Sequence, residues 1–402
     1  MERVRLVPME LPYLGNNVNL NSNNKRRTSF IRRLGLGCIV LAILGLFYFP
    51  AFHSTQDPLF GIGETPSSAG VLTDSHFLTS VVQLSGWSVN TSRDLNIYIS
   101  PDENTSILSP DEVCTSPPYL LIVVCSAVAN QKARMAIRNT WANEPSSNYQ
   151  SMNITIKVVF LLGESNNDTL NTMILDENYE YEDIIQEKFL DTYNNLTLKS
   201  VMMLKWVTKV CPKTTYVMKT DDDMYINIPT LVKELMSRSK SEGTLIGSLI
   251  CNAPPITNPK NKWYSPKYMF YEKTYPNYLS GTGYVMSSDV AFKLYEAALQ
   301  IPLLHLEDVF ITGLCARKAK LRPANHPGFS YIPRKLDSCV LKNTITAHKV
   351  NSSTMYAIWD KLSNSNTPCA STSNDNLFKI LKRYRKHISF TFSKKRNNNK
   401  CI

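Results

Sequence analysis

The sequence predicts an α/β domain built on a mainly parallel sheet, and three continuous apolar runs support this prediction. The runs are rich in β-branched residues and span 119–127 (YLLIVVCSA), 156–164 (IKVVFLLGE) and 214–220 (TTYVMKT). Such runs are typical of strands that are buried on both faces of a sheet. Segments with helical apolar spacing alternate with them, and strands that alternate with helices indicate an α/β fold.

Three segments between and after these runs are expected to be helical. Residues 183–189 (DIIQEKF) and 198–210 (LKSVMMLKWVTKV) have roughly helical apolar spacing. A further helix is expected to begin near Pro229 with Asn227 as its cap. Proline favours the first turn of a helix, and asparagine side chains cap helix N-termini.

Composition indicates a folded protein whose positive charge lies at its ends. The chain has 402 residues, of which 43% are hydrophobic, enough for a sizeable core. The net charge is +11, but residues 1–33 contribute +5 and residues 379–402 contribute +9, so the remainder carries −3. A nucleic-acid-binding protein would carry basic residues over a folded face. We therefore expect no nucleic-acid partner.

A membrane anchor is expected near the N-terminus. Residues 34–52 form an uncharged stretch of 19 residues, and a helix of that length spans about 28 Å. Five basic residues lie within residues 25–33, whereas the first Lys or Arg after the stretch is Arg93. The positive-inside rule then places residues 1–33 in the cytoplasm and the rest of the chain in the lumen. A cleaved signal peptide is the alternative, but the stretch is long for one and begins late.

Glycosylation sequons and cysteines agree with a lumenal body. Six N-x-[S/T] sequons follow the apolar stretch and none precedes it. Of the nine cysteines, Cys38 lies in the stretch and eight lie beyond it, where an oxidising compartment favours disulfides. Their connectivity is left open by the sequence. The sequence has no Cys-x-x-Cys pair or Cys/His finger spacing, which argues against structural zinc.

The composition changes between the anchor and the first strand. Residues 53–113 are rich in Ser, Thr, Pro, Gly and Asn and show no sustained apolar pattern, so we expect a stem. Folded structure is expected to begin near Tyr119, in a domain of residues 114–370. Residues 371–402 have the composition of a solvated basic tail, with a regulatory or lipid-facing role as the alternative.

Three adjacent aspartates, Asp221, Asp222 and Asp223, directly follow the apolar run 214–220. Ligands of open α/β sheets gather at the carboxyl ends of strands. Three adjacent carboxylates repel one another, so they are kept on a solvated loop or around a cation, and oxygen ligands suit Mg²⁺ or Mn²⁺. The position after a buried strand favours a metal site over a plain loop or helix cap.

The segment around these aspartates, YVMKTDDDMYIN (216–227), resembles the metal-binding segment of the animal β-1,3-galactosyltransferase family. Four further segments resemble that family in the same order. They are RMAIRNTW (134–141), YNNLTLKSVMMLKWVTKVCP (193–212), YPNYLSGTGYVMS (275–287) and LLHLEDVFITGLC (303–315). The resemblance covers about residues 119–365. It implies a GT-A-type fold, with nucleotide binding in the first half of the domain and acceptor binding in the second.

An inverting sugar transfer needs a carboxylate that takes the proton of the attacking hydroxyl and an electrophile that holds the diphosphate. The resemblance implies that Asp308, the second acidic residue of Glu307-Asp308-Val309, is the catalytic base. The alternative is that Glu307 and Asp308 only favour the first turn of a helix through its dipole.

The metal expected at this site is Mn²⁺. Asp223 is the expected direct ligand, and Asp221 and Asp222 are expected to contact ribose or metal-bound water. His348, in the looser family-like segment 345–362 (ITAHKVNSSTMYAIWDKL), is expected to complete the shell. A histidine beside carboxylates suits Mn²⁺ better than Mg²⁺.

Two arginines and two glycines complete the expected donor site. Arg134 and Arg138 are four residues apart, so on a helix they share a face and are expected to meet uridine or diphosphate, with salt bridges as the alternative. Gly281 and Gly283 permit close backbone approach to a sugar, and Tyr284 offers a ring face, although a tight turn would also explain the glycines.

Together these features predict a Golgi, type II, Mn²⁺-dependent enzyme that transfers galactose from UDP-galactose. The acceptor would be the 3-hydroxyl of a sugar, expected to be an N-acetylhexosamine, on a glycoprotein or glycolipid, and the product a β-1,3 linkage. A β-1,3-N-acetylglucosaminyltransferase is the first alternative, because spacing does not show pocket shape. A catalytically silent lectin or chaperone relative would be expected to lack the acidic residues, and an adhesion glycoprotein would not need them.

Overall fold

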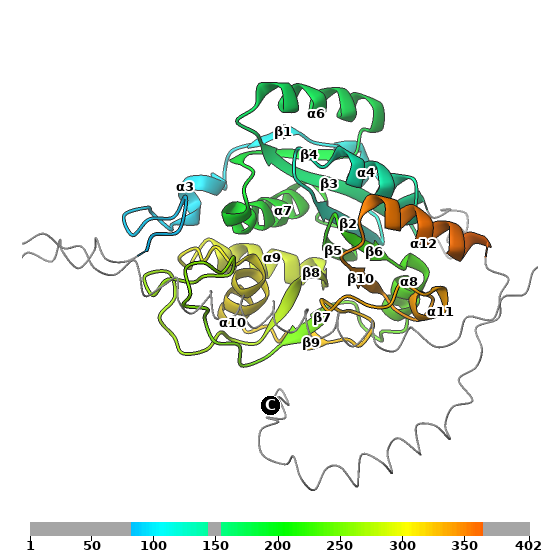
Figure 1. The fold of residues 1–402 in the computed structure, drawn as a ribbon. Coiled ribbons are helices and arrows are strands. Elements are labelled where there is room, and N and C mark those ends of the chain that lie inside the picture. Colours follow the sequence, from blue (N-terminus) through cyan, green and yellow to red (C-terminus); the bar gives the residue numbers. More distant parts are fainter. Residues whose placement is uncertain (1–81, 144–153, 365–402) are drawn as a thin grey trace, which may run out of the picture. The chain divides into compact units, whose positions relative to one another are not determined.

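A mixed eight-stranded sheet, in the order β1-β4-β3-β2-β5-β8-β7-β9, forms the centre of the protein (Figure 1). The computed structural model describes residues 82–143 and 154–364. The strands of this sheet are β1 (Ser106–Leu108), β2 (Leu120–Cys125), β3 (Ile156–Glu164), β4 (Ile184–Leu190), β5 (Tyr216–Asp221), β7 (Leu245–Ile250), β8 (Tyr278–Ser287) and β9 (Ala324–Asn325). A separate two-stranded sheet pairs β6 (Met224–Ile226) with β10 (Thr346–His348).

Helices cover both faces of the large sheet. The α-helices are α3 (Leu95–Ile99), α4 (Gln131–Arg138), α6 (Asp168–Tyr181), α7 (Leu196–Val210), α8 (Ile228–Met236), α9 (Ser288–Ala298), α10 (Ala316–Lys318), α11 (Ser338–Leu341) and α12 (Ser352–Asn364). A π-helix spans Val309–Cys315, and single 3₁₀ turns span Asp111–Cys114, Trp141–Asn143 and Tyr193–Asn195.

The three apolar runs form the parallel centre of the sheet, as predicted. They correspond to β2, β3 and β5, and β2 pairs in parallel with both of the others. Every residue of β2 is buried. Its alternate side chains enter two cores, one shared with α7 and α9 and the other with α4, α8 and α12. A strand covered on both faces must be apolar throughout, which explains the continuous runs.

Two of the three predicted helices are confirmed and one prediction is wrong. Residues 198–210 lie in α7, and α8 has Asn227 as its cap, with the Asn227 side chain accepting a hydrogen bond from the Thr230 amide at 3.0 Å. Residues 183–189 instead lie largely in β4, which pairs in parallel with β3. The four residues 184–187 are all buried. A short apolar run does not distinguish a strand from a helix, and here pairing with β3 decided.

The prediction that residues 53–113 form a stem is wrong for residues 82–113, the part of this segment that the structure describes. From residue 82 onward the chain packs on the domain, and Trp87, Leu95 and Ile99 are at most 2% exposed. The Trp87 indole donates a hydrogen bond to the carbonyl of Asn194 at 2.9 Å, and β1 pairs with β4. A few widely spaced apolar side chains hold this segment on the domain. Because the residues between them are polar, the sequence shows no apolar period there.

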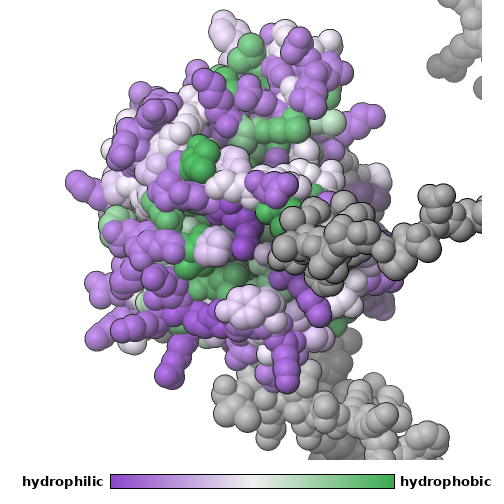
Figure 2. Space-filling view, turned by 90° about the vertical axis from the view of Figure 1, so that its left-hand side faces the viewer, coloured by the Kyte–Doolittle hydropathy of each residue, from purple (hydrophilic) through white to green (hydrophobic). Residues whose placement is uncertain are grey.

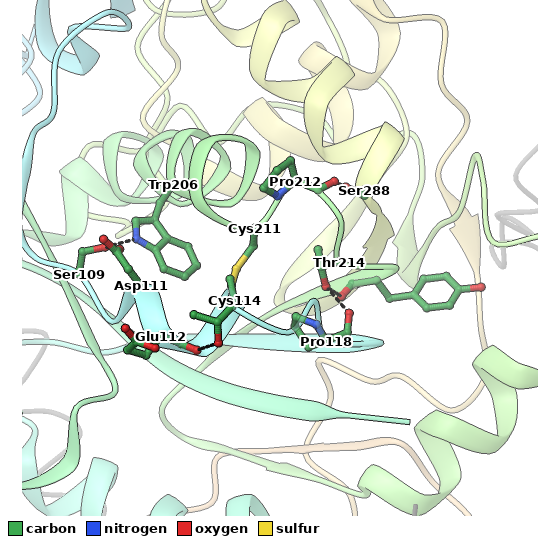
Figure 3. The surroundings of a disulfide bond; sticks show 12 residues. Ser109, Asp111, Glu112, Cys114, Pro118, Trp206, Cys211, Pro212, Thr214 and Ser288 are labelled. Carbon is green, nitrogen blue, oxygen red and sulfur yellow. Dashed lines mark hydrogen bonds between the residues drawn. A yellow bond between two sulfur atoms is a disulfide. The ribbon is translucent and has the colours of Figure 1, made fainter. Parts of the chain in front are cut away.

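A disulfide between Cys114 and Cys211 ties this N-terminal segment to the end of α7 (Figure 3). The two cysteines are 97 residues apart in sequence. Cys251 and Cys339 are also disulfide-bonded, whereas Cys125 and Cys315 are free and buried. These bonds agree with the oxidising compartment that the sequence predicts.

The predicted anchor (34–52), cytoplasmic segment (1–33) and basic tail (371–402) lie outside the described residues. Within residues 82–143 and 154–364, no helix has the length and apolar character needed to cross a membrane. Figure 2 views the side that carries α3 in Figure 1 and shows apolar patches set among polar side chains.

Candidate functional site

The acidic loop lies where β5 ends, as the sequence predicts. Asp221 is the last residue of β5, and Asp222 and Asp223 form the turn that leads into β6. β5 is buried between β2 and β8, so it holds the start of this loop rigidly. The three carboxylates diverge, and each meets a different part of the protein.

Asp223 faces His348, which comes from a segment more than a hundred residues away. Antiparallel pairing of β10 with β6 places His348 opposite Met224, and the His348 Nε2 lies 3.4 Å from an Asp223 carboxylate oxygen. The His348 Nδ1 lies 2.7 Å from the carbonyl oxygen of Tyr331. A carbonyl only accepts, so Nδ1 carries a proton; Nε2 donates to Asp223 when the ring is protonated, and in the neutral ring the Nε2 lone pair is available to a cation. The hydrogen bond with Asp223 raises the pKa of His348.

This pair fits a divalent cation held jointly by protein and substrate. The Asp223 side chain is 45% exposed, so its carboxylate is open to a ligand. Within the described parts of the chain, no group of three or more His, Cys, Asp or Glu side chains could hold a metal. A cation here would take its remaining ligands from water and a diphosphate, which is how magnesium-like ions bind at nucleotide sites.

Asp222 points toward the turn between β2 and α4. Its carboxylate accepts hydrogen bonds from the Ser126 hydroxyl at 2.7 Å and the Asn130 amide at 2.9 Å. Burial raises the pKa of Asp222, and these two hydrogen bonds oppose that effect. Asp222 and Asp223 line a cleft of about 550 Å³ whose other walls are the 128–134 segment, α6 and residues 350–352. The cleft opens at the carboxyl ends of β2 and β5, where α/β sheets bind nucleotides.

Asp221 is joined to the second acidic segment by Lys219. The Lys219 Nζ lies 2.7 Å from Asp221, 2.6 Å from the carbonyl oxygen of Gly281 and 3.5 Å from Glu307. The lysine side chain is only 4% exposed. Burial would lower the pKa of Lys219, but the charges of Asp221 and Glu307 outweigh it and raise that pKa. The buried ammonium group of Lys219 therefore holds the acidic loop against the segment where the π-helix begins.

Asp308 lies directly beside this bridge. Its carboxylate accepts hydrogen bonds from the amides of Gly281 at 3.2 Å and Val309 at 2.9 Å. Burial and, to a smaller extent, the negative charge of Glu307 raise the pKa of Asp308 to about 6. The hydrogen bonds from the two amides act in the opposite direction and lower it. A carboxyl whose pKa is raised in this way is a stronger base than an ordinary aspartate and remains ionised at neutral pH.

Comparison with known proteins identifies the family. A model of the galactosyltransferase family matches residues 132–327. The chain is 37% identical to β-1,3-galactosyltransferase 1 of Mus musculus over 258 residues, which cover 64% of this chain and 78% of the relative. It is 36% identical to β-1,3-galactosyltransferase 5 of Mus musculus, covering 69% of this chain and 90% of the relative. The chain belongs to the galactosyltransferase family.

Two further comparisons cover a smaller share of the matched protein. Identity to β-1,3-galactosyltransferase 2 of Homo sapiens is 36%, over 67% of this chain and 64% of the relative. Among solved structures, the bifunctional glycosyltransferase WbbM in its apo form matches 67% of this chain and 52% of that chain, at 10% identity and a TM-score of 0.34. The galactosyltransferase family match spans Asp221 to Asp223 and Asp308 but ends before His348.

In this galactosyltransferase Arg134 and Arg138 form ion pairs, which is the alternative that the sequence left open. Arg134 is fully buried, and its N–H groups donate to Glu177, the Ser126 hydroxyl and two backbone carbonyls, which uses every donor that a guanidinium has. Arg138 donates to Glu177 and to both oxygens of Asp183. Both arginines therefore fix α4 against α6 and the start of β4, and Arg134 with Glu177 forms part of the cleft wall.

Gly281 lies against the acidic segment, and Gly283 lies against β5. A Cβ on Gly281 would lie 3.0 Å from Glu307 and 3.3 Å from the Cβ of Asp308, so glycine lets β8 approach Asp308 closely. Gly283 is buried in β8 opposite Thr220, and Tyr284 is fully buried with its hydroxyl 2.7 Å from Glu307. Tyr284 is therefore covered by protein in this structure, and Gly283 lies within the sheet.

Several residues of the site were missed by sequence reasoning. Ser126 and Asn130 hold Asp222, Tyr331 orients His348, and Lys219 joins the two acidic segments. The role of Lys219 could have been predicted from the sequence, because a lysine inside a strand buried on both faces needs carboxylate partners. The others are ordinary loop residues whose roles depend on tertiary contacts.

Proposed function

We propose that this chain transfers galactose from UDP-galactose to the 3-hydroxyl of an acceptor sugar and forms a β-1,3 linkage. The family and the names of its relatives support this activity. The observation that carries the proposal is the junction at Lys219, which joins the acidic loop beside a nucleotide-sized cleft to Glu307, next to Asp308. A sugar transfer needs these two elements side by side, one for the donor diphosphate and one for the acceptor hydroxyl.

In the proposed reaction, Asp308 takes the proton of the acceptor hydroxyl while its oxygen attacks the anomeric carbon of galactose. The bond between that carbon and the diphosphate breaks as the new bond forms, so the configuration inverts and UDP leaves with the electron pair. The raised pKa of Asp308 suits a general base that works near neutral pH. The amides of Gly281 and Val309 hold the carboxylate in one orientation.

Asp223 and His348 are the residues that would hold Mn²⁺, which would supply positive charge to the diphosphate. Tyr331 orients the His348 ring through Nδ1. Asp222 is fixed toward the cleft by Ser126 and Asn130, where it could meet the ribose or a water molecule. The 3.4 Å between His348 and Asp223 leaves both groups available to one cation.

The proposed location is the Golgi membrane, with a type II anchor at residues 34–52 and the catalytic domain in the lumen. An N-terminal tag should be reached by antibody when only the plasma membrane is permeabilised, and glycosidase should lower the mass of the chain. A tag that stays protected until the Golgi membrane is opened would contradict this topology.

The activity is tested with the full-length chain in isolated membranes. UDP-galactose and UDP-N-acetylglucosamine are compared as donors with Mn²⁺ and a set of N-acetylhexosaminides, and the product linkage is determined by NMR. We expect galactose transfer and a β-1,3 linkage. Preferred transfer of N-acetylglucosamine would identify the alternative donor, and absence of transfer from every UDP-sugar would contradict the proposal.

A further inference from the structure

Lys199, in the first turn of α7, is a buried lysine that the proposed reaction does not use. Its side chain is 2% exposed, and that of its ion-pair partner Asp191 is 7% exposed. The Lys199 Nζ donates hydrogen bonds to the Asp191 carboxylate at 2.8 Å and to the backbone carbonyl of Ser126 at 2.7 Å. Lysine is seldom buried, because its charge loses its hydration and must be offset by partners. The partners of Lys199 therefore indicate what it holds in place.

Lys199 connects the carboxyl ends of three neighbouring strands. Ser126 directly follows β2, and Asp191 directly follows β4. The Asp191 carboxylate also accepts a hydrogen bond from the amide of Gly163, near the end of β3, at 3.1 Å. The three strands are adjacent in the sheet, in the order β4-β3-β2, and α/β sheets bind nucleotides at the carboxyl ends of their strands. Lys199 therefore fixes the backbone of Ser126 at the edge of the sheet where the cleft opens.

Ser126 connects Lys199 with the acidic loop. It is 1% exposed. Its hydroxyl oxygen lies 2.7 Å from the Asp222 carboxylate and 3.2 Å from a guanidinium nitrogen of Arg134. A guanidinium only donates, so the hydroxyl accepts from Arg134 and gives its single proton to Asp222. Lys199 thus holds the carbonyl of Ser126, Arg134 holds its hydroxyl, and the hydroxyl orients Asp222.

The orientation of Asp222 matters for the donor. Asp222 lines the cleft of about 550 Å³ in which the donor is proposed to bind. A carboxylate that is held in one orientation before the ligand arrives loses little conformational entropy on binding. Without Lys199, the backbone of Ser126 would lose an anchor, and its hydrogen bond would no longer hold Asp222 in place. Residues that orient the ligands of a site in this way commonly contribute about 10- to 100-fold to affinity or activity.

We propose that Lys199 is a positioning residue of the donor site: it holds Ser126, and Ser126 holds Asp222 in the orientation that binds UDP. This inference rests on the proposed transfer from UDP-galactose. Lys199 therefore sets donor affinity and leaves acceptor affinity unchanged. A buried ion pair that only stabilised the fold would affect neither.

The same helix provides a matched control, Lys205. It is 3% exposed. Its Nζ donates to the carbonyls of Ile99 at 2.7 Å and Ser100 at 3.0 Å, and to the Thr105 hydroxyl at 2.8 Å. These partners belong to the N-terminal segment and not to the cleft. Removing either lysine should therefore cost stability, but only removal of Lys199 should reach Asp222.

The test measures UDP affinity by calorimetry with Mn²⁺, and the donor and acceptor KM, for detergent-solubilised full-length protein. Lys199→Met should raise the UDP Kd and the donor KM by about tenfold and leave the acceptor KM unchanged. Lys205→Met should match wild type in all three. Lys199→Met leaves Asp191 buried without its cation, which endangers folding, so the double variant Lys199→Met, Asp191→Asn is measured as well and should show the same loss. Thermal unfolding shows which variants are folded.

A second double variant tests whether Lys199 acts through Ser126. Ser126→Ala should weaken UDP binding, and adding Lys199→Met to it should cause no further loss, because groups that act through one chain of contacts are not additive. Independent, additive losses would overturn the inference.

Two further outcomes would overturn it. An unchanged UDP Kd in a folded variant that lacks Lys199 would show that Asp222 does not depend on this lysine. An equal rise in Lys205→Met would show that affinity only follows stability. If wild type binds UDP but transfers no galactose, the proposed function fails, and the calorimetry still decides the role of Lys199. A wild type that binds no UDP would overturn both.

Discussion

Replacing Asp308 by Asn should lower the transfer rate and raise the stability of the protein at neutral pH. Asn keeps the shape of the side chain and an oxygen that accepts a hydrogen bond, but it does not take up the proton of the acceptor. A positioned base contributes about 10² to 10⁴ to a rate, so we expect a loss of that size in kcat. Donor binding should persist, because Asp223, His348 and the cleft are untouched.

The stability effect follows from the raised pKa of Asp308. Its ordinary value is 3.8 and its value in the fold is about 6. This difference corresponds to at most about 3 kcal/mol against the ionised form in the folded protein. Because the folded protein holds this proton more tightly, the stabilisation is complete below pH 3.8 and is lost as the pH rises through 6. Asn mimics the protonated acid, so Asp308→Asn should unfold at a higher temperature than wild type at pH 7, and the difference should shrink at low pH.

The assay measures kcat and kcat/KM between pH 5 and 8, together with UDP binding and thermal unfolding of both proteins. In wild type the ionised fraction of Asp308 falls from about 90% at pH 7 to about 10% at pH 5, so kcat/KM for the acceptor, which reports the free enzyme, should fall about tenfold over that range. A folded Asp308→Asn variant with near-normal transfer would refute the role of this carboxylate and direct attention to Glu307. A wild-type kcat/KM that stays constant down to pH 5 would refute the pKa argument.

Three further predictions follow from the buried charges, the disulfide and the metal pair. Glu177→Gln should destabilise the fold by about 3–5 kcal/mol, because it leaves Arg134 buried without its carboxylate partner. Glu234→Gln, in a half-exposed pair with Arg238, should cost less than about 1 kcal/mol in the same denaturant titration. Cys211→Ser should cost about 2–5 kcal/mol, and the Cys114→Ser, Cys211→Ser double variant no more than either single variant, since both remove the same bond. An additive double variant would contradict this. Asp223→Asn should weaken UDP-galactose binding in the presence of Mn²⁺ and abolish the effect of EDTA, measured by calorimetry, and wild-type turnover that survives EDTA would exclude the metal role.

The sheet was predictable because of burial. A strand that is covered on both faces must be apolar along its whole length, so β2, β3 and β5 appear as continuous runs in the sequence. The same argument failed for residues 183–189, where Gln186 and Glu187 are buried in β4 beside isoleucines and interrupt the run. It also failed for residues 82–113, whose few apolar anchors are too widely spaced to show a period.

The candidate site was predictable only in part. The acidic loop and Asp308 could be found because carboxylates that follow a buried strand, within a recognised order of motifs, are typical of a cation-dependent transfer site. The contacts of the arginines were not predictable, since spacing places Arg134 and Arg138 on one face of a helix but does not show what that face meets. Glu177 and Asp183 are their partners in the structure, and these partners lie on elements far from α4 in the sequence.

The sequence by itself determined the family, the central strands and the position of the acidic loop, because these depend on local pattern and on residues that stand next to one another. Only the tertiary structure decided which groups meet: pairing of β10 with β6 brings His348 to Asp223, and Lys219 joins Asp221 to Glu307. It also decided the pKa of Asp308, since burial and a neighbouring charge depend on chain segments far apart in sequence.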